Sequence, residues 1–174
     1  MGKEYIVTIK ELDEVDQTLY GKVVTYDKKK MPDNSGDGWK CWYPVGELYA
    51  TEPLYVGIVR AEPKPWLLSS MERHQDRGEW VYAIDKPMIQ TVALSSPDYP
   101  TQPDPEKTKA VLLQPGQGLM IASGVWHAVG IPSKDEVITY GFVLGAPSSE
   151  EKKRDKGWVS FTDNTIVKLV YIHP

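Results

Sequence analysis

Residues that end regular structure interrupt this chain at short intervals. Fourteen prolines and fourteen glycines are spread along its 174 residues, and the runs between them are short and rich in β-branched and aromatic residues. Runs of this kind, bounded by turn residues, are typical of the strands of a sandwich or barrel rather than of helices. The spacing therefore predicts an all-β chain.

The same pattern gives the expected elements. One segment, 10–20, is predicted to be a short N-terminal helix, because Leu12, Val15 and Leu19 recur at spacings of three and four residues. The segments 28–38 and 95–107 are predicted to be irregular loops. No internal repeat is found, and the length suits a single domain over residues 1–174. In chain order, the predicted strands are 5–9, 22–26, 54–61, 67–74, 80–84, 89–94, 110–114, 118–122, 137–144, 158–162 and 166–172.

Charge and composition argue against several classes of partner. The formal net charge of −4 would repel a phosphate backbone, so we expect no nucleic-acid partner. No apolar run approaches the roughly 20 residues of a membrane-spanning helix, and none is expected to enter a membrane. The single cysteine, Cys41, excludes an internal disulfide framework, and the first residues lack the apolar stretch of a secretory signal. A cytoplasmic location is the simplest expectation.

The segment from Ser69 to Tyr82 carries the first group of ionisable residues. In an extended strand side chains alternate between faces, so Glu72 and His74 share one face while Arg73 lies on the other. The following Gln-Asp-Arg-Gly sequence is predicted to be a tight turn that returns the chain, with Glu79 beside His74. A carboxylate and an imidazole are thus expected to meet.

A second segment, Gln114 to His127, is predicted to deliver another imidazole to the same place. It contains a glycine turn, a strand and a second glycine turn before Trp126 and His127. The two segments resemble the paired motifs of cupin barrels, in which the first motif supplies two histidines and a glutamate and the second, ending Gly-x-x-His, supplies a last histidine. Here Glu72 stands where the first of those histidines is found.

Two uses of these residues remain open. Two imidazoles and one or two carboxylates suit a divalent ion such as Zn, Mn, Fe or Ni, with Glu72, His74, Glu79 and His127 as ligands. The same groups can also exchange protons without a metal, so no cofactor is certain. A lone histidine is usually only a hydrogen-bonded filler, but the motif context favours a site at His74 and His127. For Glu72, a surface carboxylate is as good an interpretation as a ligand.

Two blocks of the sequence are similar to the ureidoglycolate lyase family. One runs from Arg60-Ala-Glu-Pro to Glu72-Arg-His74, and the other from Gly116-Gln-Gly118 to Val125-Trp-His-Ala128. The resemblance implies a cupin-like antiparallel barrel, or jelly roll, that splits ureidoglycolate into glyoxylate and urea and is often a homodimer. The family usually has glutamine at the position of Glu79, which moves this site toward a metal-binding cupin.

Catalytic roles follow from the chemistry that the resemblance implies. A base must take the proton of the substrate hydroxyl, and an acid must protonate the departing urea. His74 and His127 would exchange these protons near neutral pH, and Glu79 would orient His74.

Other residues are predicted to bind the small carboxylated substrate. Arg60 or Arg73 would hold its carboxylate, and Arg60 is preferred because Arg73 points away from His74. Tyr43 and Trp126 complete the predicted substrate-binding set. Two alternatives stay open: a metal-dependent cupin isomerase or epimerase that acts on a sugar or hydroxy acid, and a cupin that binds a small molecule without catalysis.

Overall fold

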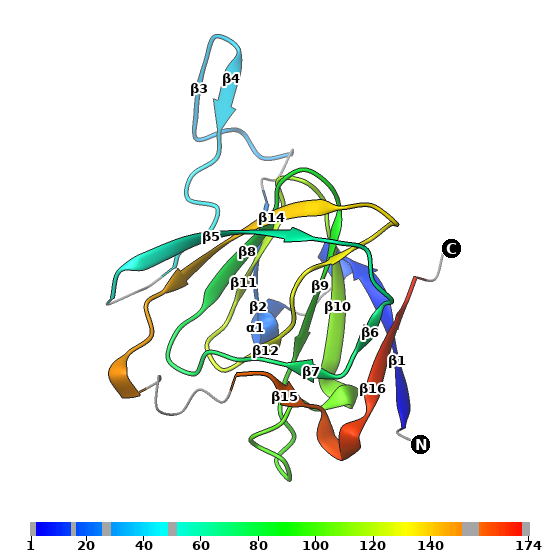
Figure 1. The fold of residues 1–174 in the computed structure, drawn as a ribbon. Helices are drawn as coiled ribbons and strands as arrows, with labels where there is room; N and C mark the ends of the chain where they lie inside the picture. Colours follow the sequence, from blue (N-terminus) through cyan, green and yellow to red (C-terminus); the bar gives the residue numbers. More distant parts are fainter. Residues whose placement is uncertain (1–2, 15–16, 26–28, 49–51, 151–156, 172–174) are drawn as a thin grey trace.

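The chain folds into two facing β-sheets. A computed structural model describes residues 3–14, 17–25, 29–48, 52–150 and 157–171. In Figure 1 the five-stranded sheet curves over one side of the body and the seven-stranded sheet lies across from it. The smaller sheet has the order β2 (Gly21–Val24), β11 (Gly118–Ile121), β8 (Glu79–Ala83), β14 (Ile138–Gly145) and β5 (Leu54–Ala61). The all-β, cupin-like architecture predicted from the sequence is confirmed.

The larger sheet has apolar layers on both of its faces. Its order is β12 (Trp126–His127), β9 (Met88–Ala93), β10 (Thr108–Leu113), β1 (Glu4–Glu11), β16 (Ile166–Val170) and β6 (Leu67–Leu68), with β13 (Ile131–Pro132) also paired to β9. On one face Val92 and Val111 pack with Val81 of the smaller sheet. On the other face Ile89 packs with Phe161. Every residue of β9 is therefore buried.

The barrel is not antiparallel throughout. β1 pairs in parallel with both β10 and β16, whereas the other pairings are antiparallel within the described residues.

The helix predicted over 10–20 is largely wrong, because strand β1 extends into this segment. Glu11 continues the β1 ladder opposite Leu112, a 3-10 turn follows at Leu12–Glu14, and α1 (Gln17–Tyr20) is a single helical turn. Pairing with β10 outweighs the weak helical preference of these residues.

The strand predicted over 67–74 is three short pieces. β6 pairs with β16, β7 (Ser70–Met71) pairs with β15 (Val159–Ser160), and Glu72 then forms an isolated bridge with His127. Because each piece has a different partner, the chain bends between them. The strand predicted over 158–162 is likewise reduced to β15, and the chain then turns at Asp163 and Asn164, which both have positive φ.

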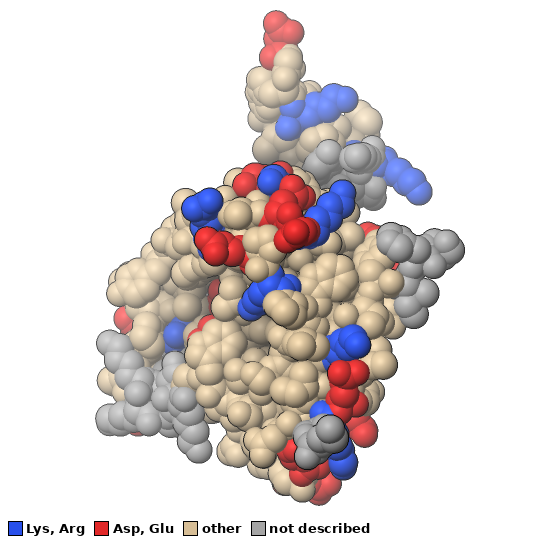
Figure 2. Space-filling model, turned by 45° about the vertical axis from the view of Figure 1, so that its right-hand side comes forward, with Lys and Arg blue, Asp and Glu red and all other residues tan. Residues whose placement is uncertain are grey.

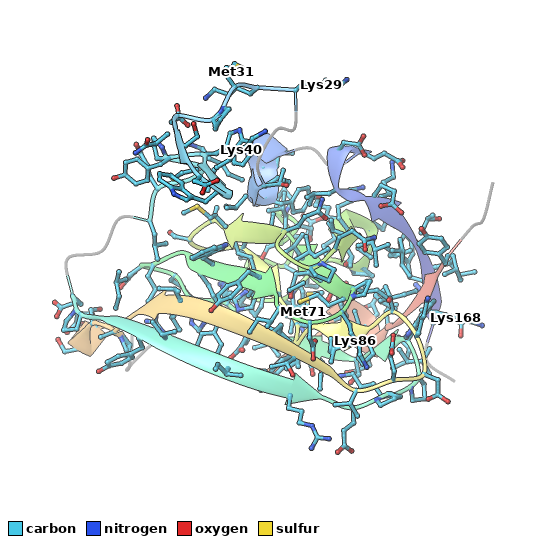
Figure 3. The ribbon with its side chains drawn as sticks, turned by 90° about the horizontal axis from the view of Figure 1, so that it is seen from above. Lys29, Met31, Lys40, Met71, Lys86 and Lys168 are labelled. Atoms are coloured by element: carbon cyan, nitrogen blue, oxygen red, sulfur yellow. The ribbon has the colours of Figure 1, made fainter. Side chains whose placement is uncertain are left out.

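The predicted loop over 28–38 contains half of a hairpin. β3 (Asn34–Gly36) pairs with β4 (Trp39–Cys41) across Asp37-Gly38, a dipeptide that is a strong hairpin signal. The hairpin projects from the body of the molecule (Figure 1). Figure 3 shows Lys40 on this hairpin and Met31 on the segment that precedes it, while Met71 lies within the body. Tyr43 lies two residues after the end of β4 and is 77% exposed.

The visible surface offers no band of a single charge. On the face drawn in Figure 2, lysine and arginine side chains lie among aspartate and glutamate side chains, with residues of other types between the groups. No helix in the described part of the chain is long and apolar enough to cross a membrane.

Two glycines should respond differently to substitution by alanine. Gly124 has φ of +80° and open space where a Cβ would stand, so Gly124→Ala should cost only the left-handed backbone, about 1–2 kcal/mol of unfolding free energy. Gly21 has φ of +139°, and its Cβ would collide with the carbonyl oxygen of Met120. Gly21→Ala should therefore cost more. Urea denaturation of both variants measures the difference, and equal losses would contradict the packing at β2 and β11.

Candidate functional site

Backbone hydrogen bonds bring the two motif segments together. Glu72 N donates to His127 O at 3.0 Å, and His127 N donates to Glu72 O at 2.8 Å. A third bond, from Gly124 N to His74 O at 2.7 Å, fixes the next part of the first segment. Residues that face each other in such a bridge project to the same side. Glu72 and His127 therefore share one side of the sheet.

That side is the interior of the barrel. His127 pairs with Val92, a core residue between the two sheets, whereas Trp126 pairs with Ala93 on the opposite face. Glu79 enters from β8, where it lies opposite Ile121. We name Glu72, His74, Glu79 and His127 the histidine–glutamate cluster.

Both imidazoles contact one carboxylate oxygen. Glu79 Oε2 lies 3.0 Å from His127 Nε2 and 3.4 Å from His74 Nε2. The two rings are 5.1 Å apart between centroids and are inclined at 53°. Both histidines are buried, and the Glu79 side chain is 12% exposed. The predicted meeting of His74, Glu79 and His127 is confirmed.

The partners of His127 indicate where its protons lie. Nδ1 is 3.1 Å from the carbonyl oxygen of Val125, which can only accept, so Nδ1 carries a proton. Nε2 is buried, and its contact with Glu79 is an ion-pair contact without regular hydrogen-bond geometry. An unprotonated Nε2 would place its lone pair next to the negatively charged carboxylate, which is unfavourable. The contact with Glu79 therefore favours the imidazolium form of His127.

The partners of His74 place its proton on the other ring nitrogen. Arg77 Nη2 lies 3.1 Å from His74 Nδ1, and a guanidinium can only donate. His74 Nδ1 must therefore accept this hydrogen bond, and the proton of the neutral ring is on Nε2, toward Glu79. The two histidines thus hold different protonation patterns around the same carboxylate.

The ionisation of Glu79 and His127 reflects this contact. Burial alone would raise the pKa of Glu79, but contacts with His127 and then His74 lower it to about 2. Burial alone would lower the pKa of His127, yet its contact with Glu79 produces a net increase. Both shifts favour a carboxylate beside an imidazolium.

The cluster also fits a divalent metal by donor type and spacing. Glu72, His74 and His127 each offer one ligand atom, and these atoms lie within 4.8 Å of one another. The buried His127 Nε2 has no hydrogen-bond partner, and its Nδ1 proton is held by a backbone carbonyl, as in many metal-bound histidines. The donor types and their spacing therefore suit a divalent ion.

Two predicted substrate-binding residues lie away from this cluster. Arg60 is exposed on β5 between Val59 and Ala61, which face the core, so it points to the outer side of the sheet. Tyr43 is exposed beside the projecting hairpin, where its backbone N–H donates to Asp33 Oδ2. The expected roles of both residues need correction, because strand alternation and the hairpin direct them elsewhere.

Arg73 and Trp126 lie together on the opposite face from His127. The Arg73 guanidinium carbon is 4.3 Å from the centroid of the Trp126 ring, and both side chains hydrogen-bond to Ser95 Oγ. Burial lowers the pKa of Arg73. The prediction that Arg73 points away from His74 is confirmed. Trp126, expected to line the pocket, instead belongs to the apolar layer that contains Met71.

Three polar residues near the cluster were missed from the sequence. Arg77 is one, and its position three residues after His74 in a turn is the signal that could have found it. Gln90, the lone amide of β9, donates through Nε2 to Ala128 O at 2.8 Å, while its Oε1 is buried without a partner. Tyr140 accepts a hydrogen bond from Gly130 N, and burial, with smaller contributions from Glu79 and Glu72, raises its pKa to about 12.

The fold and the cluster together define a cupin-like barrel with its polar residues on the inner face. The chain belongs to the ureidoglycolate lyase family, whose model matches residues 4–168. A comparison with curated proteins finds no match.

Solved structures of oxalate decarboxylases show a partial likeness. The Bacillus subtilis enzyme, described with Mn(II) centres, has 14% identity and a TM-score of 0.41, over 63% of this chain and 24% of that chain. The Lactobacillus farciminis enzyme, in a formate complex, has 16% identity and the same TM-score, over 63% and 27%. The matched part thus spans about a quarter of those chains.

Stability should depend on pH through Glu79 and His127. The lowered pKa of Glu79 gives stability that is present above about 4.5 and lost as the pH falls toward about 2. The raised pKa of His127 gives stability that is present below 6.5 and lost as the pH rises through the higher folded value. Glu79→Gln should therefore cost most between these limits, about 3 kcal/mol, in denaturation measured across pH.

A second glutamate provides the control for this measurement. Glu136 forms an ion pair of 3.0 Å with Lys86, but both side chains are more than one third exposed. Glu136→Gln should cost less than about 1 kcal/mol at any pH. A loss for Glu79→Gln that does not change with pH would contradict the ion pair.

Proposed function

We propose that this protein cleaves ureidoglycolate to glyoxylate and urea at the histidine–glutamate cluster. The observation that carries the proposal is the buried Glu79 carboxylate shared by His74 and His127, in a chain of the ureidoglycolate lyase family. The reaction needs one group that accepts a proton and one that donates a proton. The cluster contains both kinds of group within a short distance.

His127 is the proposed acid. Its contact with Glu79 favours the imidazolium, and Val125 O holds the proton on Nδ1, so Nε2–H is the proton available for transfer. As the carbon–nitrogen bond breaks, its electron pair goes to the ureido nitrogen, which takes this proton and leaves as urea. Glu79 is a poor base because its pKa is about 2, and its proposed task is to hold His127 charged.

Glu72 is the proposed base. Its side chain is half-buried and places a carboxylate oxygen within 4.8 Å of ligand atoms of His74 and His127. It would take the proton of the substrate hydroxyl, and the oxygen electrons would form the carbonyl of glyoxylate. His74, with its proton on Nε2, would donate a hydrogen bond to that oxygen and so position the substrate.

A metal ion is a second way to polarise the same substrate oxygens. If one is bound, Glu72, His74 and His127 are the residues that would hold it, and it would act as a Lewis acid on the hydroxyl and carboxylate of the substrate.

The domain organisation, oligomeric state and location of the protein are also proposals. A single domain over 1–174, a homodimer and a cytoplasmic location stay predictions from the sequence and its family resemblance.

Removal of the proposed acid should reduce turnover without unfolding the chain. His127→Gln keeps similar volume but cannot be charged, and it should lower kcat for ureidoglycolate by about 10²–10⁴-fold. Glu72→Gln should cause a loss of similar size. Release of urea and glyoxylate measures both effects, and thermal unfolding shows whether each variant is folded.

Arg60→Met is the matched control, since Arg60 is exposed on the outer side of β5. Its turnover should equal that of the wild type. Full turnover by folded His127→Gln protein would overturn the assignment of the acid. Absence of urea release by the wild-type protein would overturn the proposed function itself.

A further inference from the structure

The two histidines of the cluster differ on the side that faces away from Glu79. His127 Nδ1 donates to the carbonyl oxygen of Val125, while His74 Nδ1 accepts from Arg77. In metal sites, a histidine that binds through one nitrogen almost always donates its other ring N–H to an acceptor. His127 meets this requirement, but His74 faces a cation instead.

Binding of a metal by His74 would therefore conflict with Arg77. If Nε2 binds the ion, the neutral ring must carry its proton on Nδ1, which would point this N–H at a guanidinium that is itself only a donor. If Nδ1 binds the ion, the metal must displace Arg77. Either arrangement loses the hydrogen bond and sets like charges close together.

The same hydrogen bond determines which ring nitrogen of His74 carries the proton. With Nδ1 occupied as an acceptor, the ring presents Nε2–H toward Glu79 Oε2, 3.4 Å away. Among the arginines in the described part of the chain, Arg60 is exposed on the outer side of β5 and Arg73 stacks on Trp126. Arg77 is the arginine with a hydrogen bond to the cluster.

We propose that Arg77 is a positioning residue that holds His74 as the Nε2–H tautomer and thereby opposes a divalent metal in the cluster. The proposal rests on the proposed function only for the role of His74, because the tautomer and the metal affinity are properties of the free protein. Arg77 would thus favour proton transfer without a metal over a metal-dependent reaction at this cluster.

The tautomer can be measured directly in the wild-type protein. In ¹H–¹⁵N correlation spectra of protein with ¹⁵N-labelled histidine, His74 should show a protonated Nε2 and an unprotonated Nδ1 at neutral pH. The chain has three histidines, so His127→Gln and His173→Gln variants assign the signals. A proton on His74 Nδ1 in the wild type would overturn the proposal.

Metal affinity provides the second measurement. Calorimetric titration with Zn²⁺ should give at least about tenfold tighter binding for Arg77→Met, which removes the donor, than for the wild type. Arg77→Lys, which keeps a cationic donor, should stay close to the wild type, and so should Arg60→Met. Equal Zn²⁺ affinity of wild type and folded Arg77→Met would overturn the proposal. If Arg77→Met does not fold, the wild-type tautomer decides.

These results separate this proposal from the proposed function. Failure of the wild type to release urea from ureidoglycolate would overturn the lyase assignment and leave the tautomer and Zn²⁺ measurements unaffected. Conversely, a wild type that turns over ureidoglycolate but carries its proton on His74 Nδ1 would retain the function and lose the role of Arg77.

Discussion

The site depends on one short backbone pairing between segments that are far apart in the chain. Two hydrogen bonds join Glu72 to His127, and a third joins Gly124 to His74. These bonds turn the side chains of Glu72 and His127 into the barrel and leave Met71 and Trp126 in the apolar layer on the other side. Without this bridge the two imidazoles would have no fixed relation to Glu79.

Around that bridge, charge is concentrated where water is largely excluded. A carboxylate that is 12% exposed contacts two buried imidazoles, and removal of Glu79 or His127 would leave a buried charge without its partner. Buried charged groups reduce the stability of a β-sheet core, where the neighbouring positions are apolar. Their presence favours a chemical role over a purely structural one, and the family supplies a reaction that needs a proton donor and a proton acceptor.

Sequence reasoning predicted the strands of the smaller sheet well and the edges of the larger sheet poorly. β5 was predicted with its observed bounds, because Leu54–Ala61 is a β-rich run between turn residues. The segment 67–74 was predicted as one strand, but its pieces pair with three different partners. The local pattern indicates a preference for extended backbone, whereas the choice of partner strand depends on residues far away in the chain.

The sequence by itself determined the β architecture, because turn residues and strand alternation are local properties. The resemblance of two segments to paired cupin motifs also predicted that His74, Glu79 and His127 meet, although a long-range backbone pairing brings them together. Only the tertiary structure decided which arginine reaches the cluster. Arg60, which was preferred, lies on the outer side of β5, and Arg77, which was overlooked, contacts His74. The reason is physical: the direction of a side chain in a bent or turning segment is set by packing against distant strands, and spacing along the chain does not encode it.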